Sequence, residues 1–149
     1  MNSDQVRIFE VTFELINDLS ELNRLNQKFE DLLTSQIIDK KTLFYLNLIG
    51  DELITNLISY GYEDDREHSI LIHLVITPTY WTLKIQDDGQ PFNPLKHDNP
   101  ELHVPVEERA IGGLGIYFVK QIMDEISYER NESHNIINMK KHHIIGNEA

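Results

Sequence analysis

The sequence contains no cysteine, so it can form neither disulfide bridges nor thiolate metal sites. No apolar run approaches the roughly 20 residues that a membrane-spanning helix needs. The first five residues, Met1 to Gln5, also lack the basic and apolar regions of a signal peptide. We therefore expect a cytoplasmic protein with no attachment to a membrane.

Positive charge is scarce. The chain has 13 Lys and Arg residues against 25 Asp and Glu residues, which gives a formal net charge of -12. Because proteins bind nucleic acid through many Lys and Arg contacts to phosphate, we expect no direct nucleic-acid ligand. The charge is compatible with a basic protein partner, although most acidic surfaces serve only solubility.

The remaining composition is that of one folded domain. The chain has 149 residues, of which 40% are hydrophobic and 26% charged. Apolar periodicity predicts helices and strands in alternating groups, with strands joined mostly by hairpins. We predict an α+β domain in which helices cover one face of a mixed, mostly antiparallel sheet. The expected strands are 6–15, 70–76, 81–85, 127–130 and 135–140, and the expected helices are 21–34, about 39–60 and about 116–126.

The segment 50–62 places two polar side chains in an apolar helix. Glu52 and Asn56 are four residues apart, so they lie on the same helix face. A buried acid and a buried amide cost free energy unless each has a partner. A polyanionic ligand with its cation would supply both partners.

Two glycine-bearing turns add to this pattern, at 87–92 and at 112–115. Asp87 follows a predicted strand, where its carboxylate can accept a hydrogen bond from an exocyclic amine such as that of adenine. Asp88 is better explained as a turn carboxylate than as a second acceptor. Glycines at 112, 113 and 115 precede a helix, whose unpaired first-turn amides are suited to phosphate.

In order and spacing, these three blocks resemble the ATP-binding boxes of the superfamily that includes DNA gyrase, a heat-shock chaperone, histidine kinases and the MutL proteins (GHKL). Within it, the chain is most similar to bacterial anti-sigma-factor serine kinases. The resemblance covers about residues 6–140. It implies a single histidine kinase-like domain over 1–149, with the two-layer α/β sandwich of the Bergerat type and an ATP lid at about 93–111.

The resemblance also implies a role for individual residues. Asn56 would bind Mg²⁺, and Glu52 would be the general base that acts on the attacking hydroxyl. Arg109 would reach the γ-phosphate as the lid closes. Tyr60 stands where the family often has a histidine. The ATP-binding residues would be Asn56, Asp87, Gly89, Pro91, Gly112, Gly113, Leu114 and Gly115, with Pro91 replacing a family glycine.

The implied function is an ATP-dependent, Mg²⁺-dependent protein serine/threonine kinase that is also an anti-sigma factor and regulates transcription. It would phosphorylate a serine of a STAS-type anti-sigma-factor antagonist, bind a sigma factor and form a homodimer. Two alternatives remain: a nucleotide-gated regulatory module without kinase activity, and a stand-alone histidine-kinase-type catalytic domain. Glu52 favours catalysis because simple binding does not need it. A gyrase-like or chaperone-like ATPase would need a further transducer domain, for which 149 residues leave no room.

Overall fold

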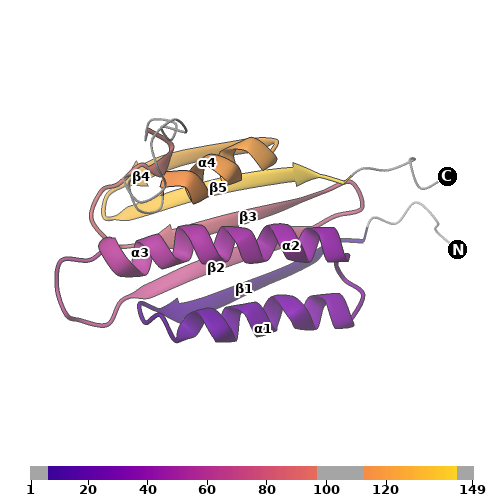
Figure 1. The fold of residues 1–149 in the computed structure, drawn as a ribbon, viewed down its shortest axis with the longest axis horizontal. Helices are drawn as coiled ribbons and strands as arrows, with labels where there is room; N and C mark the ends of the chain where they lie inside the picture. The colour runs from indigo at the N-terminus through magenta and orange to yellow at the C-terminus, as the bar shows by residue number, and fades with distance from the viewer. Residues whose placement is uncertain (1–6, 97–112, 144–149) are drawn as a thin grey trace, which may run out of the picture.

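The computed structural model describes residues 7–96 and 113–143. These residues form a layer of helices packed on a five-stranded sheet (Figure 1). None of the helices in these two ranges is long and apolar enough to cross a membrane. In chain order the elements are β1 Phe9–Ile16, α1 Glu21–Thr34, α2 Lys40–Ile49, the π-helical segment η1 Gly50–Ile54, α3 Thr55–Tyr60, β2 Ser69–Ile76, β3 Tyr80–Asp87, the 3-10 turn η2 Pro94–Lys96, α4 Gly113–Ile122, β4 Glu125–Asn131 and β5 His134–His142.

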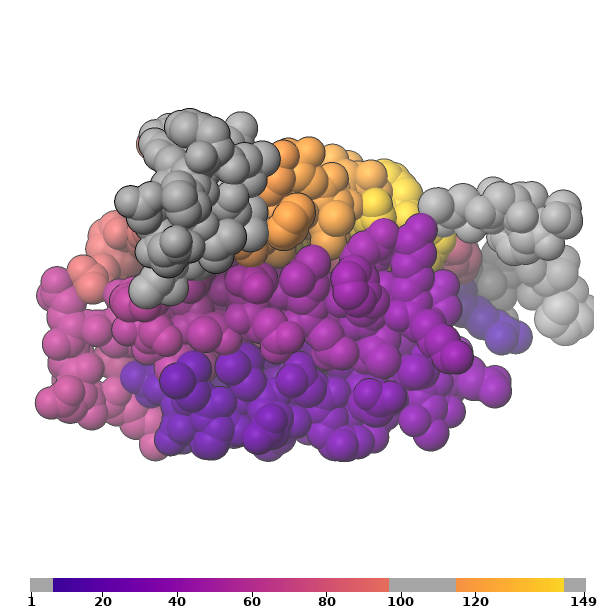
Figure 2. All heavy atoms as spheres, in the orientation of Figure 1, coloured from indigo at the N-terminus to yellow at the C-terminus, as the bar shows by residue number. Residues whose placement is uncertain are grey.

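The strands follow the order β1-β2-β3-β5-β4, and every pairing between them is antiparallel. The helices α1, α2, α3 and α4 lie on one face of this sheet (Figure 1). The predicted α+β class and its helices on one face are therefore confirmed. Side chains fill the space between the ribbons of α1 and α2 (Figure 2).

Alternation along the strands builds the core. In β3 the odd-numbered residues Trp81, Leu83, Ile85 and Asp87 are buried, whereas the even-numbered residues are partly exposed. The three apolar side chains pack in the core with those of the helices. Asp87 occupies the last position of the same buried row, so the sheet itself directs a carboxylate into the interior.

The predicted helix over about 39–60 is continuous but changes its hydrogen-bonding pattern midway. Asp39 caps its start, since the Asp39 side chain accepts a hydrogen bond of 2.8 Å from the Thr42 amide. Between Gly50 and Ile54 the helix becomes a π-helix, the wider form that is frequent at functional sites. Glu52 lies in this segment, and Asn56 lies in α3 immediately after it.

The prediction that α4 continues to Ile126 is wrong. The Met123 amide still donates to the Val119 carbonyl (3.1 Å), but the Asp124 amide donates to the Lys140 carbonyl of β5 (3.0 Å). The chain leaves the helix at this point and joins the sheet. Ile126 lies in β4 opposite Met139, where it still packs against the core.

Candidate functional site

The segment 50–62, which carries Glu52 and Asn56, contacts both of the glycine-bearing segments. Near its start, Glu52 approaches Gly115 so closely that a Cβ atom on Gly115 would overlap the Glu52 carboxylate. At its end, the Gly61 carbonyl accepts a hydrogen bond of 2.9 Å from the Gln90 amide. The fold therefore brings the three blocks together along the η1–α3 segment.

Asp87 is buried at the end of β3, with 6% of its surface exposed. Its Oδ1 accepts hydrogen bonds from the Gly89 amide (2.8 Å) and from Asn135 Nδ2 (3.0 Å). Burial raises the pKa of the Asp87 carboxyl, although these two bonds oppose the change. Asp87 is thus a buried acceptor that two hydrogen bonds hold in place.

Asn135 of β5 holds the turn that follows Asp87. It lies opposite Asp87 in the β3–β5 pairing and is 4% exposed. Its Nδ2 also donates to the Gln90 carbonyl (2.8 Å), and its Oδ1 accepts from the Tyr128 hydroxyl (2.5 Å). The sequence analysis missed Asn135, and only the register of the last hairpin against β3 could have indicated it.

Arg130 of β4 makes a second link to the same turn, through a hydrogen bond of 2.9 Å from its guanidinium to the Gly89 carbonyl. It too was missed, for the same reason. Gly89 also faces Gly61, because a Cβ atom on Gly89 would collide with the Gly61 carbonyl oxygen. Glycine at position 89 is therefore required by close packing of two main-chain segments.

Glu52 and Asn56 are both partly buried. Burial raises the pKa of the Glu52 carboxyl, and the neighbouring negative charge of Asp51 raises it further. In the described ranges, no group of three or more His, Cys, Asp and Glu side chains is arranged to hold a metal ion. Asn56 carries a neutral side-chain oxygen, a ligand type that Mg²⁺ uses together with phosphate and water.

The structure describes only some of the remaining predicted site residues. Gly113 begins α4, Leu114 follows it in the first turn, and Pro91 is exposed beyond the Asp87 turn. Arg109, Gly112 and positions 97–111 of the predicted lid lie outside the described residues. Tyr60, which stands where the family often has histidine, is 62% exposed at the end of α3.

A family model described as the histidine kinase-like ATPase domain matches residues 15–141. Serine/threonine-protein kinase BtrW of Bordetella bronchiseptica is 28% identical over 101 residues, which are 66% of this chain and 70% of that protein. Serine-protein kinase RsbW of Oceanobacillus iheyensis is 26% identical over 70% of this chain and 67% of its own length. Anti-sigma F factor of Bacillus thuringiensis is 27% identical over 59% of this chain and 60% of its own length.

Proposed function

Since the chain belongs to the histidine kinase-like ATPase domain family, we propose that it is a protein serine/threonine kinase acting on a STAS-type anti-sigma-factor antagonist. The relatives named serine-protein kinase and anti-sigma F factor support an ATP-dependent regulatory role. The observation that carries the proposal is the buried carboxylate of Asp87, which accepts hydrogen bonds from Asn135 Nδ2 and from the Gly89 amide.

The adenine ring would be recognised by Asp87. Both hydrogen bonds described for this carboxylate use Oδ1, so we assign the other oxygen, Oδ2, to the exocyclic amine of the base. Guanine presents a carbonyl at the equivalent position, and two acceptors cannot share a hydrogen bond. Gly89 lets the main chain of the turn approach the base, and Pro91 continues this wall.

The phosphates would lie at the start of α4, because the first-turn main-chain amides of a helix, here those of Gly113, Leu114 and Gly115, have no partner within the helix. We assign Gly112 to the same phosphate site by the resemblance alone. Asn56 would offer its side-chain oxygen to Mg²⁺. Bound magnesium-ATP supplies a γ-phosphoryl group whose charge the cation partly neutralises.

Glu52 would accept the proton of the attacking serine hydroxyl. Its raised pKa makes the carboxylate a stronger base than an exposed glutamate, provided that it is deprotonated at the working pH. Arg109 would stabilise charge on the transferred group. Gly115 leaves the space that the Glu52 carboxylate occupies, so the phosphate loop and the base fit together.

We extend the proposal to the protein's partners by its resemblance to the anti-sigma-factor kinases. The chain would form a cytoplasmic homodimer that binds a sigma factor and releases it when the unphosphorylated antagonist binds. The name anti-sigma F factor of one relative supports this regulatory setting.

The test is transfer of phosphate from magnesium-ATP to the STAS-type protein encoded nearest this gene, read by intact mass. We expect the antagonist to gain one phosphate with the wild type and none with Glu52→Gln. Asp51→Asn is the matched control, because it alters the adjacent, exposed acid and should still transfer at about pH 8. ATP binding without transfer by the wild type would replace the kinase with a nucleotide-gated binding module.

A further inference from the structure

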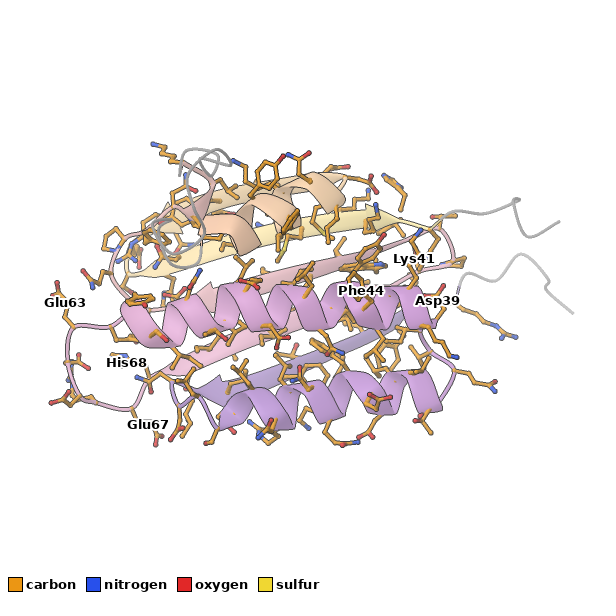
Figure 3. The ribbon with its side chains drawn as sticks, in the orientation of Figure 1. Asp39, Lys41, Phe44, Glu63, Glu67 and His68 are labelled. Atoms are coloured by element: carbon orange, nitrogen blue, oxygen red, sulfur yellow. The ribbon has the colours of Figure 1, made fainter. Side chains whose placement is uncertain are left out.

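The imidazole of His68 lies between two carboxylates from different parts of the chain. His68 Nε2 is 2.7 Å from Asp64 Oδ1, and His68 Nδ1 is 3.0 Å from Asp88 Oδ1. The histidine side chain is only 12% exposed. It stands at the end of the 61–68 connection between α3 and β2, at the opposite end of the helical layer from Asp39 (Figure 3).

The doubly protonated ring fits this geometry best. A neutral imidazole carries one N–H donor and one lone pair, so one of its nitrogens would face a carboxylate oxygen without a proton between them. The imidazolium donates to both carboxylates. Accordingly, the hydrogen bond to Asp64 raises the pKa of His68, burial opposes this effect, and Asp88 adds to it.

The surroundings hold the ring in place. Its plane stacks on the Tyr62 ring, with the centroids 4.4 Å apart and an angle of 20° between the planes. The His68 amide donates to Asn17 Oδ1 (2.8 Å) at the end of β1. Among the described residues, the charged or titratable groups around the imidazole are Tyr62 and Asp64 with its partner Arg66 on the connection, and Asp88 at the end of β3.

Asp88 directly follows the proposed adenine acceptor. The Asp87 turn is tied to the last hairpin by Asn135 and Arg130, and to the end of α3 by the Gly61 carbonyl. His68, which directly precedes β2, links the Asp87 turn to the ends of β1 and β2 through its contacts with Asp88 and Asn17. We infer that His68 is a positioning residue for the Asp87 turn, and that its protonated form strengthens nucleotide binding. This inference rests on the proposed function.

The sign of the pH effect follows from the two bonds. A histidine whose pKa is raised in the fold keeps its proton below the ordinary value of about 6.5 and loses it as the pH rises through the raised value. Loss of the proton removes one of the two hydrogen bonds and frees Asp88. Nucleotide affinity should therefore fall as the pH increases above about 6.5.

The experiment measures the dissociation constant of magnesium-ADP by calorimetry at about pH 6.5 and about pH 9. We expect the wild type to bind about fivefold more weakly at the higher pH. His68→Gln should remove this difference, because glutamine does not titrate. The titration of the ADP phosphate is common to both proteins and cancels in the comparison.

His73→Gln is the matched control. His73 also faces one carboxylate, that of Glu10 (2.5 Å), but it lies in β2 away from the turn, so the variant should keep the wild-type pH dependence. Asp88→Asn replaces the carboxylate with an amide, whose oxygen can accept from the protonated ring and whose NH₂ group can donate to the neutral ring. This variant should therefore abolish the pH dependence even if His68→Gln folds poorly. An unchanged pH dependence in either turn variant overturns the role of His68. Failure of the wild type to bind at both pH values overturns the nucleotide site itself.

Discussion

At the scale of single residues, the candidate site depends on which partner each polar atom has. Asp87 Oδ1 already accepts two hydrogen bonds from the protein. A third donor, the proposed amine of the base, must therefore bind to Oδ2. An amide would offer one oxygen and one NH₂ group. The NH₂ group would then face either Asn135 Nδ2 or the amine of the base, which are themselves donors.

Asp87→Asn should therefore fold but lose nucleotide binding. We expect the affinity for ATP to fall by about 100-fold or more, because a site built around a hydrogen bond penalises an unpaired donor strongly. Titration calorimetry measures the affinity, and circular dichroism checks that the sheet is intact. Unchanged affinity would remove Asp87 from the adenine site.

The raised pKa of Glu52 predicts the acid limb of the pH–rate profile. A general base acts only when deprotonated, so transfer should decline as the pH falls through this raised value. Asp51→Asn removes the neighbouring charge, which is the second cause of the shift after burial. The limb should then move to lower pH in measurements of kcat/KM against pH. A limb that stays in place or moves to higher pH would contradict the assignment of Glu52 as the base.

At the scale of elements, η1 and the start of α4 form one unit, because Glu52 occupies the space beside Gly115. Gly115→Ala should displace the Glu52 carboxylate. We expect phosphate transfer to fall by about 100-fold, since a misplacement of about 1 Å can cost that much.

Gly50→Ala is the matched control for that variant. Gly50 is the first residue of the π-helical segment, but a Cβ atom there would be 3.4 Å from Leu25 Cδ2, an ordinary contact. Intact-mass transfer assays should show activity in Gly50→Ala and loss in Gly115→Ala. Equal rates in the two variants would show that the close approach of Glu52 to Gly115 has no catalytic importance.

Much of the arrangement of elements could be predicted from local pattern. The helix Glu21–Thr34 agrees with its predicted bounds, and the next helix begins at Lys40, close to its predicted start at about 39. These features depend on apolar spacing and on caps, both of which are local. The π-helical turn in Gly50–Ile54 and the early end of α4 were not predicted, because tertiary packing and the start of pairing with β5 determine them.

The site was predictable only in its local parts. The three blocks and their glycines could be recognised in the sequence, and the fold brings Glu52 to Gly115 and Gly61 to Gly89. Asn135 could not be recognised, because its importance arises from the strand register that places it opposite Asp87. The contact between His68 and Asp88 likewise joins segments that only the folded sheet brings together.

At the scale of the whole molecule, the net charge of -12 is spread over only 149 residues. Like charges repel one another more in the compact state than in the unfolded chain. Raising sodium chloride to about 0.5 M should therefore stabilise the fold, because screening is effective beyond the Debye length of about 10 Å at 0.1 M. We expect a rise in Tm of about 2–4 °C in thermal unfolding followed by circular dichroism. A fall in Tm would mean that attractive ion pairs outweigh the repulsion.

The pairing of Asp87 with Asn135 also bears on how the protein is made. The two residues are 48 positions apart, and Asn135 belongs to β5, the last strand in chain order among the described residues. During translation, β3 leaves the ribosome well before β5, so a nascent chain has Asp87 without the residue that holds it. The proposed adenine acceptor is therefore complete only when β5 has joined the sheet. ATP bound at the proposed site would therefore favour the finished domain over its partly synthesised forms.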